Sequence, residues 1–127
     1  MLDRRTFLFT AAATAGATMA APALADPSGQ FTGATGHVTK GRATLSGAAG
    51  AQTVVLQDDF WFDGAPDPRV GLGRNGKFDP DTDLGELRKN TGGQTYSVPA
   101  GLDLSRHNEI YIWCRKFSVP LGVAKLN

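Results

Sequence analysis

Turn-forming residues divide the chain into short pieces after residue 25. Glycine and proline recur there about every 8–12 residues, a spacing typical of domains built from short β-strands. The same region contains no long amphipathic helical pattern and no repeat. We therefore predict an all-β protein, with a single antiparallel β-sandwich or barrel-like domain over residues 26–127.

Apolar residues at a period of two place the strands of this domain. Residues 53–62 show the alternation, and Asp58 interrupts it, so we expect a bulge or a strand end near residues 58–59. Asn75-Gly76 predicts a tight hairpin turn, because both central positions of a type I′ turn need positive φ. For residues 83–89 a strand is favoured over a helical turn. The expected strands cover residues 31–46, 53–62, 69–73, 83–89, 95–99, 109–117 and 119–126.

A glycine-rich run coincides with a nucleotide-binding pattern. Residues 71–76 spell Gly-Leu-Gly-Arg-Asn-Gly, the G-x-G-x-x-G of dinucleotide-binding folds. That motif works only where a helix begins at its end and presents backbone amides to the pyrophosphate. Here Asn75-Gly76 and Pro80 indicate a turn. The run therefore argues against a nucleotide site.

The first 25 residues resemble an export signal. Arg4 and Arg5 precede a weakly apolar stretch, and a small-x-small sequence at residues 23–25 marks a cleavage site. The paired arginines favour twin-arginine export. We expect a mature chain that begins at Asp26, lies in the periplasm or is secreted, and retains no stable membrane span.

The mature chain is electrically balanced. Removing Asp3, Arg4 and Arg5 from the 13 basic and 12 acidic residues of the full sequence leaves 11 of each. A net charge of zero gives no electrostatic reason to expect nucleic acid as a partner.

Cys114 is the single cysteine of the sequence. In an oxidising compartment it cannot form a disulfide within the chain, so it is buried, ligated or reactive. In a regular strand it shares a face with Ile110 and Ile112, while Tyr111 and Trp113 lie on the other face. That alternation points Cys114 into the core, where a free thiol is usually an inert small hydrophobe.

Metal binding is a further alternative for the thiol. The mature chain has the histidines His37 and His107 and no methionine, so the ligand set of a blue-copper site is incomplete. Cys114 with His37, which opens an expected strand, remains a candidate pair for copper or zinc. Covalent c-type haem is excluded, because no C-x-x-C-H is present. His107 lies on an expected loop, where a solvated side chain is predicted.

A series of short segments extends over nearly the whole mature chain. The segments are Phe31-Thr32-Gly33, Gly36-His37-Val38-x-x-Gly41, Asp59-Phe60, Gly64-x-Pro66-Asp67, Val70-x-Leu72, Asp83-Leu84-Gly85-x-Leu87, Gly93-Gln94-x-Tyr96-x-Val98-Pro99, Leu102-Asp103-Leu104, Ile112-Trp113-Cys114-x-x-Phe117 and Gly122-x-Ala124-x-Leu126. The Ile-Trp-Cys element that ends at Cys114 is the most specific of them. In order and spacing these segments resemble the DM-thirteen domain family, the electron-transfer DM domain found in DOMON and Skeletor-type proteins.

The resemblance implies a β-rich extracytoplasmic module whose characteristic cysteine, here Cys114, is the redox centre. His107 stands where the family is expected to have an aromatic residue, which argues against a shared role for it. We hypothesise an electron-transfer module rather than a conventional enzyme, with a periplasmic redox partner protein. Trp113, Tyr96 and His37 are candidate neighbours of the thiol, and haem or copper are candidate cofactors. The alternative is a non-catalytic binding or structural module with a buried, inert Cys114.

Overall fold

The computed structural model describes residues 25–127. The predicted targeting segment therefore lies outside the described residues, apart from Ala25. The described part consists of strands joined by turns, with one short 3-10 helix, η2 (Pro80–Thr82). The strands are β1 (Ser28–Gly33), β2 (Thr39–Lys40), β3 (Arg42–Ser46), β4 (Thr53–Leu56), β5 (Trp61–Phe62), β6 (Pro68–Arg74), β7 (Lys77–Asp79), β8 (Gln94–Ser97), β9 (Glu109–Cys114) and β10 (Val119–Lys125).

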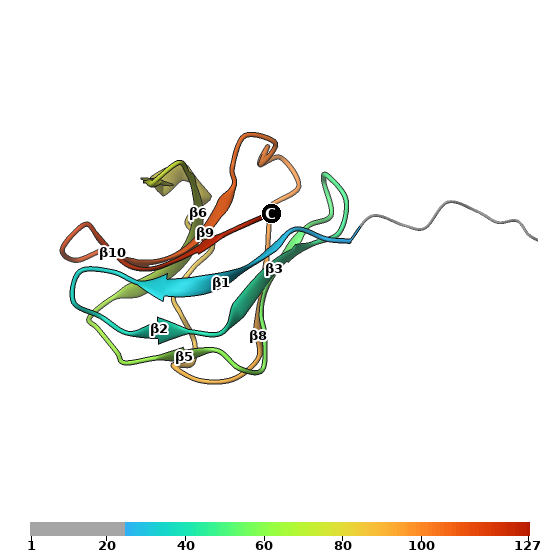
Figure 1. The fold of residues 1–127 in the computed structure, drawn as a ribbon. Coiled ribbons are helices and arrows are strands. Elements are labelled where there is room, and N and C mark those ends of the chain that lie inside the picture. The colour runs from blue at the N-terminus through green and yellow to red at the C-terminus, as the bar shows by residue number, and fades with distance from the viewer. Residues whose placement is uncertain (1–24) are drawn as a thin grey trace, which may run out of the picture.

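Eight of these strands form one antiparallel sheet that curls into a half-barrel (Figure 1). Its order is β7-β6-β9-β10-β1-β3-β4-β8, and β2 and β5 pair separately as a two-stranded ribbon. The predicted all-β class with antiparallel pairing is thus confirmed. Strand β9 lies between β6 and β10, so both of its edges are hydrogen-bonded. A side chain on β9 is therefore held by strands on both sides.

The concave face of the sheet holds the hydrophobic core. The predicted alternation of residues 53–62 is confirmed, because Val54, Leu56, Phe60 and Phe62 are all buried. The predicted strand end is confirmed as well: β4 stops at Leu56 and a turn occupies residues 58–59. Each large core side chain contributes about 1.5–3 kcal/mol by its removal from water. This burial holds the fold without an internal disulfide.

The β6–β7 hairpin turns at the predicted place. Asn75 and Gly76 have φ of 51° and 88°, as a type I′ turn requires. The prediction of a strand over residues 83–89 is wrong. Gly85 has φ of 120°, which breaks the pleat, and the segment makes only one isolated bridge, between Glu86 and Arg69. It follows the edge of β6 as an irregular strap.

Candidate functional site

Cys114 is the last residue of β9, and its side chain points into the core. It lies opposite Pro68 of β6 and Val119 of β10, and it is 1% exposed. Ile110 and Ile112 of the same strand are fully buried on the same side. The predicted inward orientation of the thiol is confirmed.

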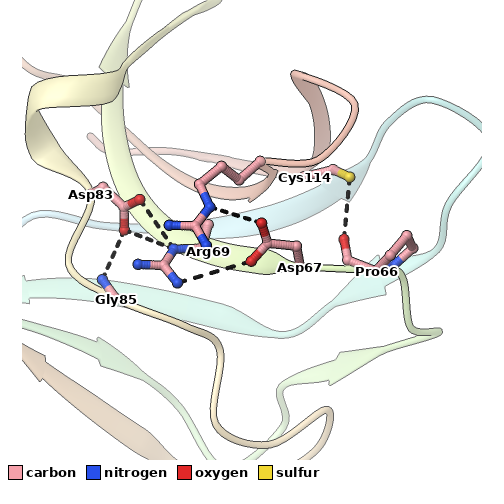
Figure 2. A network of polar contacts seen from close by, with 7 residues as sticks. Pro66, Asp67, Arg69, Asp83, Gly85 and Cys114 are labelled. Carbon is pink, nitrogen blue, oxygen red and sulfur yellow. Dashed lines mark hydrogen bonds and ion pairs between the residues drawn. The ribbon is translucent and has the colours of Figure 1, made fainter.

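The Cys114 sulfur has a polar partner on the loop between β5 and β6. Its S–H donates to the carbonyl oxygen of Pro66, at 3.2 Å (Figure 2). Pro66 itself is solvent-exposed. The thiol is therefore buried beneath a loop residue that itself reaches solvent.

An ionic network fixes this loop next to the thiol (Figure 2). Asp67 accepts a hydrogen bond of 2.8 Å from Nε of Arg115, and Nη1 of Arg69 lies 3.9 Å from its other oxygen. Asp83 accepts from Nε of Arg69 at 3.1 Å and from the amide of Gly85 at 2.9 Å. The hydrogen bond to Asp67 raises the pKa of Arg115. These contacts bind the loop to the strap and to the end of β9.

His37 contacts the same loop at another point. It lies in the turn before β2 instead of opening a strand, and its Nδ1 is 2.8 Å from Oδ1 of Asp63. The hydrogen bond with His37 lowers the pKa of Asp63. Cys114 binds Pro66 further along the loop, and no polar contact joins the thiol to His37. Within residues 25–127 no group of three or more His, Cys, Asp or Glu side chains could hold a metal ion.

Tyr96 lies on β8, at the opposite edge of the sheet order from β7. Its hydroxyl donates to Oε1 of Gln94 and accepts from the amide of Arg88, and the Arg88 guanidinium lies 4.2 Å from its ring centre. Burial raises the pKa of Tyr96. Its polar contacts all lie near β8, and none reaches Cys114.

Comparison with known families decides the identity. The family model described as Electron transfer DM13 matches residues 30–126. The chain belongs to the DM13 family. The resemblance stated from the Ile-Trp-Cys element is thereby confirmed. Comparisons with curated proteins and with solved structures found no match. None of the helices among residues 25–127 has the length and apolar character that a membrane crossing requires.

Trp113 of the DM13 domain lies on the outer face of the sheet, away from the thiol. Its ring stacks on Phe78 of β7, with centroids 4.4 Å apart and planes inclined by 11°. Tyr111 contacts both rings edge-on, at centroid distances of 5.6 Å from Phe78 and 6.3 Å from Trp113. We call Phe78, Tyr111 and Trp113 the outer aromatic cluster. Cys114 and Trp113 are adjacent in sequence but serve opposite faces.

Two glycines of β6 make room for the outer aromatic cluster. A Cβ on Gly71 would lie 2.6 Å from the Phe78 ring, and one on Gly73 would lie 2.5 Å from the Tyr111 ring. Gly71 is opposite Tyr111 in the β6–β9 register. The two glycines of the G-x-G in the apparent nucleotide motif therefore leave space for aromatic rings. A β-hairpin follows them in place of a helix.

A buried carboxylate completes this face of the DM13 domain. Glu109 is 2% exposed, and its Oε1 accepts from the Tyr111 hydroxyl at 3.1 Å and from the Gly76 amide at 2.8 Å. Burial and the adjacent Glu109 raise the pKa of Tyr111 to about 12. Glu109 was not among the site residues predicted from the sequence. The available signal was its alternation with Tyr111 and Trp113 on one face of β9.

His107 is not solvated as predicted. Its side chain is 13% exposed, and its Nε2 lies 2.7 Å from Oδ2 of Asp79. Asp79 ends β7 and caps η2. The hydrogen bond with His107 lowers the pKa of Asp79. This pair ties the end of β7, the edge strand that carries Phe78, to the loop before β9.

Proposed function

We propose that this DM13 domain is an exported redox module in which Cys114 is the working thiol. Membership of the electron-transfer family supports the proposal, and Cys114 is the one side chain of the sequence able to undergo thiol chemistry. The observation that carries it is the position of the sulfur at a strand end, under the exposed residue Pro66. Movement of the β5–β6 loop alone would uncover the thiol and leave the sheet intact.

The reaction that suits a single thiol is exchange with a disulfide of a partner protein. Cys114 loses its proton as the loop opens, and the thiolate attacks one sulfur of the partner's disulfide. An S–S bond forms between Cys114 and the partner as the partner's own S–S bond breaks. The partner's second sulfur leaves as a thiolate and takes up the proton. In this step the Cys114 sulfur is oxidised to the disulfide level and the partner's leaving sulfur is reduced to a thiol. The reverse exchange returns both proteins to their starting forms.

The compartment follows from the same proposal. The twin-arginine-type segment at residues 1–25 would deliver the folded domain to the periplasm. Proteins with disulfides persist in that oxidising compartment, so the required partner class is present there. No step of the exchange involves a metal or a haem.

A second function is favoured by a specific observation. Cys114 is 1% exposed, and its S–H donates a hydrogen bond to the carbonyl oxygen of Pro66. Both features are typical of a structural thiol. In that case the domain is a non-catalytic extracytoplasmic module, and Cys114 fills core volume.

Thiol labelling separates the two functions. The native protein is incubated with an excess of a small disulfide reagent, and labelling of Cys114 is followed by mass spectrometry beside the rate of global unfolding. The redox function predicts labelling faster than global unfolding, because the loop opens locally. It also predicts a mixed disulfide at Cys114 after incubation with an oxidised periplasmic extract. Labelling only at the rate of global unfolding, with no mixed disulfide, would support the structural function.

An absorption spectrum tests the cofactor hypotheses separately. The protein is purified from its own host after export. A haem band or a copper–thiolate band would overturn the exchange reaction. A colourless, metal-free protein with a labelled thiol agrees with it.

A further inference from the structure

The outer face of β9 combines an accessible indole with a buried phenol. Trp113 is half-buried and stacks on Phe78, whereas Tyr111 is 2% exposed. Their ring centroids are 6.3 Å apart, so the ring edges lie close enough for fast electron tunnelling. Trp113 is thus the contact point for solvent or a partner, and Tyr111 is the insulated inner site.

The phenol of Tyr111 has a proton acceptor already in place. Its hydroxyl donates to Oε1 of Glu109 at 3.1 Å, and that carboxylate is itself 2% exposed. The Gly76 amide donates to the same oxygen at 2.8 Å and fixes its position. A buried carboxylate bonded to a buried phenol is not required by strand pairing, since β9 pairs through its backbone.

We propose that Trp113 and Tyr111 form a one-electron relay in which Glu109 accepts the phenolic proton of Tyr111. The relay lies on the opposite face of the sheet from Cys114 and does not depend on the chemistry of the thiol. It extends the electron-transfer role of the family to a site made of aromatic side chains. The partner it requires is an oxidised metal centre able to accept one electron at Trp113.

The electron and the proton follow separate routes. The oxidant takes one electron from the Trp113 indole and leaves a radical cation near the surface. Tyr111 then supplies one electron to Trp113, which restores the indole. The Tyr111 phenolic proton moves at the same time to Oε1 of Glu109 and leaves a neutral tyrosyl radical beside a carboxylic acid. One electron from a reduced metal centre of a second partner returns to the Tyr111 radical, and the proton returns from Oε1 of Glu109 to the phenolate oxygen, which restores the resting state.

The surroundings of Tyr111 make the coupled proton transfer necessary. A phenol radical cation at this site would be a buried charge without solvent, which is unfavourable. The pKa of Tyr111 is raised to about 12 by burial and by Glu109, so the phenol retains its proton until it is oxidised. Transfer of the phenolic proton to Glu109 as the electron leaves avoids the buried radical cation and removes the proton that the phenol would otherwise retain.

Tyr96 provides a matched control within the chain. It is equally buried, at 2% exposed, but its hydroxyl faces the Gln94 amide and the Arg88 backbone. An amide oxygen does not take up a proton at neutral pH. Tyr96 should therefore resist oxidation under conditions that oxidise Tyr111.

Flash photolysis with a photogenerated ruthenium(III) complex as oxidant tests the relay. The background is Trp61→Phe, because Trp61 is 42% exposed and would compete as an electron donor. The chain has two tryptophans and two tyrosines, so this background leaves Trp113 as the single indole. Transient absorption should show the tryptophanyl radical, followed by the tyrosyl radical.

Single substitutions in that background assign the radicals. Tyr111→Phe should remove the tyrosyl signal and prolong the tryptophanyl signal, whereas Tyr96→Phe should change neither. Glu109→Gln keeps an oxygen for both hydrogen bonds but takes up no proton, and should slow tyrosyl formation by about a hundredfold. Circular dichroism confirms that each variant is folded.

Three outcomes would overturn the relay. These are a tyrosyl signal that survives Tyr111→Phe, one that disappears in Tyr96→Phe, or a rate unchanged in Glu109→Gln. Cys114→Ser should leave the radical kinetics unaltered. The relay and the thiol exchange can therefore fail independently.

Discussion

The two faces of β9 are built on different principles, although they alternate along six residues. The inner face presents Ile110, Ile112 and Cys114 to a broad apolar core. The outer face presents Glu109, Tyr111 and Trp113, each in contact with two or three defined partners. The inner face is stabilised mainly by removal of surface from water, and the outer face by specific fits.

The difference teaches where the domain tolerates change. A core of many contacts loses stability in proportion to the volume that is removed. The space that a β6 glycine leaves for one aromatic ring has no room for an added side-chain atom. The Glu109 carboxylate accepts two specific hydrogen bonds, from the Tyr111 hydroxyl and the Gly76 amide, whereas the thiol on the other face occupies a position suited to a small apolar side chain. The outer face is therefore the more specialised one.

The largest expected effect comes from adding a side-chain atom to a β6 glycine that packs against the outer aromatic cluster. In Gly73→Ala the new Cβ would lie 2.2 Å from the Lys77 carbonyl oxygen and 2.5 Å from the Tyr111 ring. Backbone cannot move aside easily, so we expect a loss of about 3 kcal/mol in the free energy of unfolding, measured by urea denaturation. Gly101→Ala is the control: its Cβ would meet nothing within 4 Å, and stability should stay within about 1 kcal/mol of wild type. Equal free energies of unfolding for the two variants would contradict the close packing around Gly73.

Removing the hydroxyl of Tyr111 should have a smaller effect on stability. Tyr111→Phe keeps the ring and deletes the donor to Glu109, which leaves a buried carboxylate with one hydrogen bond fewer. We expect a loss of about 2 kcal/mol in the same denaturation experiment. Glu109→Gln in the Tyr111→Phe background removes the charge that was left behind, and should restore part of the loss. A further loss of stability of similar size would show that the charge left on Glu109 does not cause the destabilisation of Tyr111→Phe.

On the inner face, Cys114→Ser should cost about 1.5 kcal/mol. The serine hydroxyl can still donate to Pro66, but it is more polar than a thiol in an apolar site. Thermal denaturation gives the value, with Cys114→Ala as the comparison. Disulfide exchange by the wild type that is lost in a folded Cys114→Ser protein supports the redox function. A wild type that shows no exchange, with a serine variant that only melts earlier, supports the structural function.

The inner face could be predicted from sequence because its rule is local. Period-two alternation over residues 109–114 places Cys114 with Ile110 and Ile112 without any knowledge of the neighbouring strands. Turn chemistry predicted the fold class in the same way, since Asn75-Gly76 sets its own geometry. Neither inference needed a distant partner.

The outer face could not be predicted because its contacts depend on register. Gly71 meets Tyr111 only when β6 and β9 pair in the observed alignment, and no local pattern specifies that alignment. The contact between Cys114 and Pro66 spans 48 positions and depends on an irregular loop. His107 and Asp79 are likewise brought together only by the folded sheet.

The β5–β6 loop that covers the Cys114 thiol should open more often when its ion pairs are weakened. Asp67→Asn removes the charge that pairs with Arg115 and Arg69 beside Pro66. A partly exposed ion pair is worth about 1 kcal/mol or less, so thiol labelling should accelerate by up to about fivefold. Asp58→Asn is the matched control, because Asp58 is exposed and its carboxylate accepts no hydrogen bond within the described residues. Equal rates in both variants would mean that the loop does not control access to Cys114.

The smallest effect concerns the pair of His107 and Asp79 at the end of the edge strand β7. The hydrogen bond with His107 lowers the pKa of Asp79 below its ordinary value of 3.8. A carboxyl group with a lowered folded pKa stabilises the protein above the unfolded value, and this contribution is lost as the pH falls through the folded value. Asp79→Asn should therefore be less stable than wild type near neutral pH, by less than about 1 kcal/mol because the pair is partly exposed, and the two should converge in acid. Denaturation at a series of pH values checks this. Asp81→Asn removes a charge nearby whose carboxylate makes no ion pair or hydrogen bond among residues 25–127, and should run parallel to wild type. If Asp79→Asn also runs parallel, the pair does not stabilise the end of β7, and the β6–β7 strand pairing and the stacking of Phe78 on Trp113 position that strand without it.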